Sequence, residues 1–250
     1  MADWLPVTTG ESGARVFRSA DGSRYRKVVD AAGVAELAGE RDRIEWAVDH
    51  GVPGPSVLGF RPTGDGAELV TSAVAGTPAD RLDLDGLAAA WPAIVAAVRV
   101  LHAIPVSACP YRRDLDEMLE RARGIVARDE LHRDFLSDED RERPAAWLLQ
   151  RVERDAARRR AQEQSGAVVC HGDLCLPNVI VDAAGAVGFV DLGRLGVADP
   201  HADLSLLLES ARQAFPDFAD SAYRGVVADY PRRIDDDRLA FYLWLDPLTW

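Results

Sequence analysis

The sequence predicts an α+β fold of two lobes, a small strand-rich amino-terminal lobe followed by a larger and mainly helical one. Short apolar runs separated by turn residues continue to about Val74, as in antiparallel sheets. Beyond them lie longer apolar stretches typical of buried helices, such as Leu87–Val98. With 250 residues and 48% hydrophobic content, the chain can bury a large core. We expect a first lobe over residues 1–74, a connector over 75–85 and a helical lobe over 86–250.

Each predicted element follows from local patterns. Residues 24–29 read as a strand after the turn at 20–23, and residues 32–50 as a helix with Leu37, Ile44 and Val48 facing inward. A strand over 68–71 ends the first lobe. An apolar helix should begin near Asp85 and reach His102, and its uncharged run is too short to span a bilayer.

The most informative segment runs from Val168 to Gly193. His171, Asp173 and Asn178 fit the pattern H-x-D-x-x-x-x-N, in which the aspartate accepts the proton of an attacking hydroxyl and the asparagine binds magnesium. Asp191 would be the second metal ligand. A purely structural alternative is that residues 171–173 form a turn after a buried strand and that Asp191 caps the following loop. The spacing of the whole set argues against it, and the pattern predicts a phosphoryl-transfer loop.

A tight hairpin is predicted between the two metal ligands. Residues 179–181 and 187–190 are apolar and flank the turn 182–185, as in a two-stranded hairpin. Such a hairpin would bring Asn178 and Asp191 together, and their oxygen atoms are ligands that Mg²⁺ prefers.

Lysine usage is the second independent signal. The chain has 29 basic residues, and Lys27 is the only lysine among them. A compact ammonium suits a point contact to the α- and β-phosphates of ATP, whereas chance survival in an arginine-rich chain is the alternative. On the following helix Glu40 lies beside the apolar stripe and is the favoured partner of Lys27. Glu36 is a second candidate, and Arg41 could neutralise Glu40 locally.

A possible phosphate-covering flap precedes the Lys27 strand. Residues 8–13 lie between short apolar runs, and Ser12 is the side chain expected at the β-phosphate. The segment lacks the full G-x-G-x-x-G pattern, so the interpretation as a flap depends on its position just before the Lys27 strand.

These motifs together resemble the aminoglycoside phosphotransferases, and within that family the streptomycin 3''-phosphotransferase branch. The resemblance covers nearly the whole chain. It rests on DWLPV at 3–7, GESG at 10–13, ELAGERDR at 36–43, VVCHGDLCLPN at 168–178, DLGRLGVAD at 191–199 and LAFYLWLDPLTW at 239–250.

The resemblance implies a protein-kinase-like fold and ATP-dependent phosphorylation of an antibiotic hydroxyl, most closely the 3''-hydroxyl of streptomycin. Asp173 would be the base, Asn178 and Asp191 would bind Mg²⁺, and Lys27 with Glu40 would hold the nucleotide. The triplet at 171–173 has glycine where protein kinases have arginine, which is typical of small-molecule kinases.

Further roles come from the same resemblance. The backbone from Ser72 to Val74 should receive the adenine, and Arg194 matches an arginine at the catalytic centre. Asp203 matches a residue that orders the catalytic loop. Asp246 and the carboxylate of Trp250 are the expected contacts to the acceptor.

Charge and cysteine content restrict the partners. A formal charge of −12 disfavours nucleic acid and anionic membranes, and favours a cationic acceptor such as streptomycin. An odd number of cysteines, three, without a C-x-x-C pair suits the cytoplasm, and the chain opens without a secretion signal pattern. No obligate protein partner is evident. A kinase for another aminoglycoside or cationic metabolite, and a non-catalytic drug- or nucleotide-binding module, remain as alternatives.

Overall fold

The chain divides into two compact units in the computed structural model, which describes residues 3–7 and 14–250. Unit 1 comprises Met1–Leu82 and Pro177–Arg194, and unit 2 comprises Asp83–Leu176 and Leu195–Trp250. The chain thus returns to unit 1 for one short passage, which begins at Pro177, shortly after the H-x-D triplet. The lobes expected from the sequence were contiguous and did not include this return.

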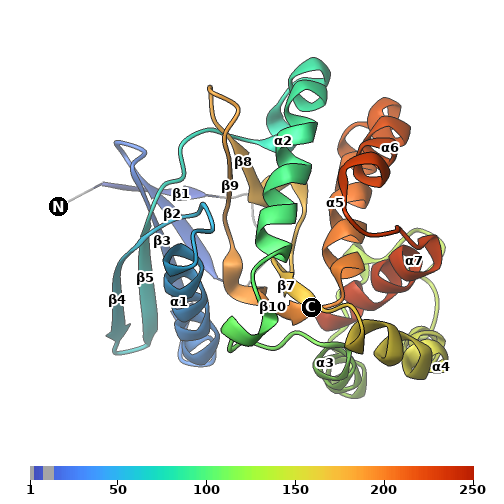
Figure 1. Cartoon of the computed structure of the whole chain (residues 1–250). Coiled ribbons are helices and arrows are strands. Elements are labelled where there is room, and N and C mark those ends of the chain that lie inside the picture. Colours follow the sequence, from blue (N-terminus) through green and yellow to red (C-terminus); the bar gives the residue numbers. More distant parts are fainter. Residues whose placement is uncertain (1–2, 8–13) are drawn as a thin grey trace. The chain divides into compact units, whose positions relative to one another are not determined.

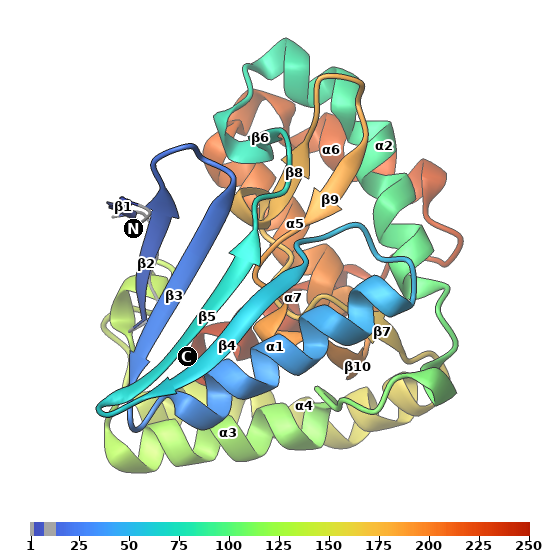
Figure 2. The same ribbon diagram turned by 90° about the vertical axis from the view of Figure 1, so that its left-hand side faces the viewer.

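Unit 1 is built on an antiparallel sheet with strand order β1-β2-β3-β5-β4. Its strands are β1 (Trp4–Val7), β2 (Arg15–Ser19), β3 (Arg24–Asp30), β4 (Val57–Thr63) and β5 (Gly66–Ser72). Helix α1 (Val34–Asp49) runs along β4 and β5 (Figure 2). A second sheet has the order β6-β8-β9, formed by β6 (Thr77–Pro78), β8 (Val179–Val181) and β9 (Val187–Phe189).

The buried stripe of α1 differs from the predicted one at its end. Leu37 and Ile44 are buried as expected, but Val48 is 41% exposed, and Ala47 is buried in its place. Glu40 belongs to the same buried stripe. The spacing of three, four and three residues from Leu37 to Ala47 follows one helix face, and Val48 lies one position beyond it.

Unit 2 is mainly helical. Its helices are α2 (Leu84–His102), α3 (Leu115–Arg128), α4 (Ala145–Gln164), α5 (Pro200–Ala214), α6 (Ala219–Asp229) and α7 (Asp236–Leu245). A two-stranded antiparallel sheet pairs β7 (Val168–Cys170) with β10 (Gly196–Ala198). Residues of α3, α4 and α7 share one apolar core, and α5 packs against α6 and α7 (Figure 1).

Helix α2 agrees with the predicted apolar helix, except that it starts one residue earlier. Asp83 is its N-cap and accepts a hydrogen bond from the Gly86 N–H at 2.7 Å. Of the helices described, α2 alone has the length and apolar composition to cross a membrane. It is longer than the uncharged run seen in the sequence. Its buried face, however, packs within unit 2 against α6 and β7, as a core helix does.

Glu163 makes the stability of unit 2 dependent on pH. Its carboxylate, in the last turn of α4, accepts from the Leu115 N–H that opens α3, at 3.1 Å to each oxygen. Burial is the largest influence and raises the pKa of Glu163 from 4.5 to about 7. Between these values the folded state binds more protons than the unfolded state, so this group's contribution to stability is lost as pH rises.

We expect Glu163→Gln to remove this loss. A glutamine cannot ionise, so the variant should exceed the wild type in free energy of unfolding at pH 8, by up to about 3 kcal/mol, and match it near pH 4.5. Urea unfolding at several pH values measures the difference. Parallel stability curves for the two proteins would contradict the assignment.

Candidate active site

Lys27 lies between two carboxylates in unit 1. Its Nζ donates to Glu40 Oε2 at 2.8 Å and to Asp191 Oδ1 at 3.2 Å. Strand β3 supplies the lysine, α1 supplies Glu40, and Asp191 follows β9. Glu40, favoured over Glu36 in the sequence, is therefore the partner on α1. An ammonium has three donors, so two such bonds leave one for a phosphate oxygen.

The ionisation of the pair follows from its surroundings. Burial opposes the charged form of Lys27, but the carboxylates of Asp191 and Glu40 outweigh it and hold the pKa of the lysine above its usual value. Burial raises the pKa of Glu40, and the nearby charge of Asp191 adds to this while Lys27 counteracts it. Lys27 is thus a fixed positive charge at every physiological pH.

The hairpin between the proposed metal ligands forms as predicted. Strands β8 and β9 pair antiparallel from Val179 opposite Phe189, and Val190 N–H donates to the Asn178 carbonyl at 3.0 Å. This bond holds Asn178 beside the residue that precedes Asp191. Asp191 adopts a left-handed backbone with φ of 59°, which is uncommon outside glycine and is tolerated by aspartate. Its side chain is 44% exposed, so its carboxylate can receive a further ligand.

The H-x-D triplet belongs to unit 2 and is held through its backbone. His171 and Gly172 donate their N–H groups to Asp203 Oδ2 and Oδ1 at 2.7 and 2.8 Å. The Asp173 N–H donates to His171 Nδ1 at 3.2 Å. Gly172 has φ of 85°, a conformation that favours glycine and accounts for its place in the triplet. Asp173 itself is half-buried, with Cys175 Sγ 3.8 Å from its Oδ1.

The predicted adenine-binding segment follows β5. The Ser72 N–H donates to the Ser56 carbonyl and the Ala73 N–H to the Ser23 carbonyl, at 2.9 and 2.8 Å. These two donors are therefore engaged within the sheet, and Val74 is the next residue along the chain. Ser12 lies outside the described residues.

Arg194 ends a short turn that rests on α1. The turn Leu192–Arg194 packs on the helix, where a Cβ built on Gly193 would lie 3.6 Å from the Glu40 Cβ. Arg194 is half-buried. The turn thereby joins the Asp191 segment to the residue that pairs with Lys27.

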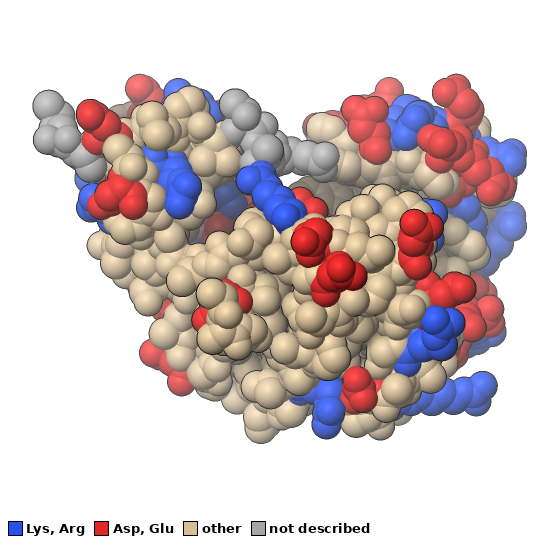
Figure 3. Space-filling model, turned by 90° about the horizontal axis from the view of Figure 1, so that it is seen from above, with Lys and Arg blue, Asp and Glu red and all other residues tan. Residues whose placement is uncertain are grey.

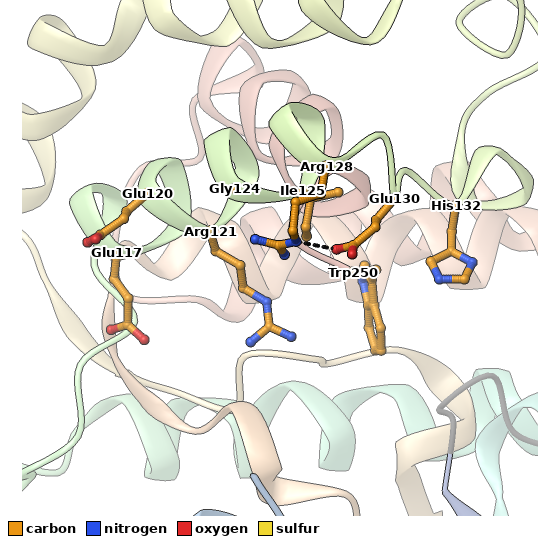
Figure 4. Close-up of a pocket in the computed structure, with 9 residues that line it drawn as sticks. All are labelled: Glu117, Glu120, Arg121, Gly124, Ile125, Arg128, Glu130, His132 and Trp250. Carbon is orange, nitrogen blue, oxygen red and sulfur yellow. Dashed lines mark hydrogen bonds and ion pairs between the residues drawn. The ribbon is translucent and has the colours of Figure 1, made fainter. Parts of the chain in front are cut away.

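A pocket of about 810 Å³ lies in unit 2 beside α3 and the C-terminal residue. Its walls are rich in charged side chains: Glu117, Glu120, Arg121, Arg128 and Glu130, with His132, Gly124, Ile125 and Trp250. In Figure 4 the side chains of Glu117, Arg121 and Trp250 extend toward the same side of α3. Arg121 Nε donates to the Thr249 carbonyl at 2.7 Å, which ties the C-terminal residues to this helix.

Trp250 is positioned by Asp246. Its indole N–H donates to Asp246 Oδ2 at 3.0 Å, and its ring packs against Phe135 at 5.5 Å. Asp246 is only 8% exposed and also accepts from Arg113 Nη2 at 3.2 Å. Of the two expected acceptor contacts, Trp250 lines the pocket, whereas Asp246 is not among the lining residues and contacts the indole of Trp250.

Comparison with known proteins decides the family. The model of the phosphotransferase enzyme family matches residues 3–242. A streptomycin 3''-kinase from Streptomyces griseus is 53% identical, over 99% of this chain and 93% of its own. The chain belongs to the aminoglycoside phosphotransferase family.

Other members of the family give the same result. An aminoglycoside 3'-phosphotransferase from Streptomyces fradiae is 35% identical over 98% of this chain and 94% of its own. The solved aminoglycoside phosphotransferase APH(3'')-Id from Streptomyces rimosus has a TM-score of 0.95 and 51% identity, covering 100% of this chain and 93% of its own. A second structure of that protein, in complex with ADP and streptomycin, has a TM-score of 0.94 and 50% identity. The resemblance and the kinase-like α+β class are confirmed.

The sequence did not reveal three groups that support these aminoglycoside phosphotransferase motifs. His102 bonds to Asp203, Tyr230 bonds to His102, and Arg113 bonds to Asp246. Each is distant in sequence from its partner. The one available signal was a histidine at the end of an apolar helix, which predicts a buried imidazole that needs hydrogen-bond partners.

Acidic and basic side chains are interspersed over the coloured parts of the face in Figure 3, although the net charge is −12. The excess of acids on this family member is consistent with solubility as well as with attraction of cations. Local geometry, not overall charge, therefore has to identify the acceptor site.

We expect Glu40→Gln to weaken binding of a non-hydrolysable ATP analogue about tenfold, because loss of the carboxylate leaves Lys27 to draw Asp191 away from other ligands. Glu36→Gln on the same helix is the matched control and should stay within about twofold. Calorimetric titration of each variant with the ATP analogue, in the presence of Mg²⁺, measures both affinities. Equal effects of the two substitutions would contradict the role of Glu40.

Proposed function

We propose that this protein transfers the γ-phosphoryl group of ATP to a hydroxyl of an aminoglycoside, the 3''-hydroxyl of streptomycin, and so confers resistance. The observation that carries the proposal is the arrangement of Lys27, Glu40 and Asp191 beside Asn178, in a chain 53% identical to a protein named streptomycin 3''-kinase. The complex of the similar Streptomyces rimosus enzyme with ADP and streptomycin supports both substrates.

Asp173 is the proposed base. The acceptor hydroxyl donates a hydrogen bond to its carboxylate, its oxygen forms a bond to the γ-phosphorus, and the bond from that phosphorus to the bridging oxygen of ADP breaks. The hydroxyl proton passes to Asp173. Asp203 accepts hydrogen bonds from the backbone N–H groups of His171 and Gly172, and these bonds keep the Asp173 carboxylate at a fixed place in the loop. Most of the acceleration then comes from positioning.

The nucleotide contacts are proposed from unit 1. Lys27 would meet the α- and β-phosphates, with Glu40 fixing its direction. The Ser72 N–H is engaged within the sheet, so Val74 is the stronger candidate of the two for the adenine contact. Ser12 is proposed at the β-phosphate from its place in the sequence alone.

The residues present fit magnesium. Asn178 and Asp191 offer hard oxygen ligands, and the β8–β9 hairpin with the bond from the Val190 N–H to the Asn178 carbonyl brings their backbone segments side by side. The ion, when bound with ATP, would neutralise charge that develops on the phosphates. Asn178 and one oxygen of Asp191 would hold it, while Lys27 holds the other oxygen. Arg194 is proposed to act on the same phosphates from the turn that follows.

The pocket beside α3 is proposed as the acceptor site. Its three glutamates, Glu117, Glu120 and Glu130, could pair with guanidinium groups of streptomycin, which carboxylates bind through paired hydrogen bonds. Trp250 would provide an apolar wall and its carboxylate. Asp246 is proposed to orient Trp250.

The lobe assignment and the compartment are also proposals. We assign nucleotide binding to residues 1–74, the connector to 75–85, and the catalytic loop with the acceptor site to the helical lobe over 86–250. We also assign the enzyme to the cytoplasm, on its three cysteines without a C-x-x-C pair.

The test is ADP release by the purified protein with Mg²⁺ and ATP, in the presence of streptomycin, kanamycin or neither. We expect stimulation by streptomycin alone, with the phosphate on the 3''-oxygen by NMR of the product. Stimulation by kanamycin instead would assign another aminoglycoside. Drug binding without ADP formation would support a non-catalytic module and overturn the proposal.

Asp173→Asn separates chemistry from binding. The amide keeps the size of the side chain but cannot accept the proton, so kcat should fall by roughly 10²- to 10⁴-fold. Affinity for the ATP analogue should stay within about threefold, since the nucleotide contacts are in unit 1. Near-normal turnover would remove Asp173 from the role of base.

A further inference from the structure

A chain of buried polar side chains leads from α6 to the catalytic loop within unit 2. Tyr230, directly after α6, has its hydroxyl 2.8 Å from His102 Nδ1 at the end of α2. His102 Nε2 is 3.1 Å from Asp203 Oδ2 in the first turn of α5. The same carboxylate accepts the N–H groups of His171 and Gly172. Tyr230, His102 and Asp203 are 5%, 8% and 0% exposed.

The direction of these hydrogen bonds follows from the donors and acceptors available. A carboxylate only accepts, so the proton between His102 and Asp203 belongs to Nε2. When the imidazole is neutral, Nδ1 is an acceptor, and the Tyr230 O–H then donates to it. Burial opposes ionisation of Asp203, but its bonds from His102 and from the loop outweigh this and lower its pKa. Tyr230 therefore satisfies the buried Nδ1 of the His102 tautomer that the Asp203 carboxylate selects.

A bound cation is a poorer account of this cluster. His102, Cys170 and Asp203 place ligand atoms within 4.8 Å of one another. Both oxygens of Asp203 and both nitrogens of His102 already have hydrogen-bond partners. Burial raises the pKa of the Cys170 thiol, so sulfur keeps its proton and bonds the Asp199 carbonyl at 3.5 Å.

We propose that Tyr230 and His102 are positioning residues for phosphoryl transfer, acting through Asp203 on the backbone that carries Asp173. Neither touches substrate in this role. The expected effect of Tyr230 and His102 on turnover rests on the proposed function, whereas their effect on the loop is independent of the acceptor. Loss of the Tyr230 hydroxyl leaves the buried Nδ1 without its donor, so the imidazole can turn toward another partner and weaken its hydrogen bond to Asp203.

The test compares Tyr230→Phe with Tyr223→Phe in the full-length protein. Tyr223 lies on α6 and its hydroxyl donates to Asp236 at the surface, so it is a matched control. We expect Tyr230→Phe to lower kcat about tenfold while the KM values for ATP and streptomycin change less than about twofold, because the loop is displaced but the binding contacts remain. Tyr223→Phe should leave all three values unchanged.

Two measurements apply without activity. Nitrogen-15 NMR of the imidazoles should show His102 protonated at Nε2 in the wild type and a changed pattern in Tyr230→Phe. Hydrogen exchange at the His171 and Gly172 amides should be faster in that variant. His102→Gln, which keeps an N–H donor for Asp203, should retain more kcat than His102→Ala.

The outcomes separate this inference from the proposed function. If Tyr230→Phe keeps the wild-type kcat and unchanged exchange, or if the two tyrosine variants lose activity equally, the positioning role of Tyr230 and His102 is overturned. A wild type that is inactive with streptomycin would overturn the proposed acceptor, and the exchange measurement would still decide the positioning role.

Discussion

The buried carboxylate of Asp203 is the constraint on which the arrangement of unit 2 depends. A charge with no exposed surface is costly unless hydrogen bonds replace its hydration. Here two backbone N–H groups of the catalytic loop and the imidazole of His102 replace it. The start of α5, the end of α2 and the segment after β7 must therefore meet at one point. The geometry of the loop that carries Asp173 is a consequence of satisfying this one charge.

Unit 1 uses charge in a different way. Lys27 lies between Glu40 and Asp191 with 18% of its side chain exposed, against 12% and 44% for the two carboxylates. The group is neither fully buried nor fully hydrated, and the left-handed backbone of Asp191 places its carboxylate beside the lysine. Such an arrangement is settled before any ligand binds, so that little reorganisation is needed when phosphates arrive. Positioning in unit 2 and preorganised charge in unit 1 thus depend on separate sets of contacts.

Sequence patterns predicted what depends on short spacing. The β8–β9 hairpin was visible in its apolar runs, and the Lys27–Glu40 pair in a lone lysine followed by a helix with an acid on its inner face. Helical spacing alone could not decide between Ala47 and Val48, because they follow Ile44 by three and four residues and both positions lie on its side of a helix. The Tyr230–His102–Asp203 relay could not be predicted, since its members lie 128 and 101 residues apart. Nor does any local pattern indicate that 177–194 returns to unit 1.

The single lysine follows from the same physics. Arginine serves this chain elsewhere even in buried places, as where Arg159, almost fully buried, packs over the Phe241 ring at 5.2 Å. A guanidinium is planar and binds a carboxylate side-on with two donors. At position 27 the cation must instead bond one oxygen of Glu40 and one of Asp191 and keep a donor for a third group. Donors arranged around one nitrogen meet this requirement, whereas a planar fork would commit its donors to one carboxylate. Lysine therefore replaces arginine at position 27, where the site requires a compact charge with donors around one nitrogen as well as a positive sign.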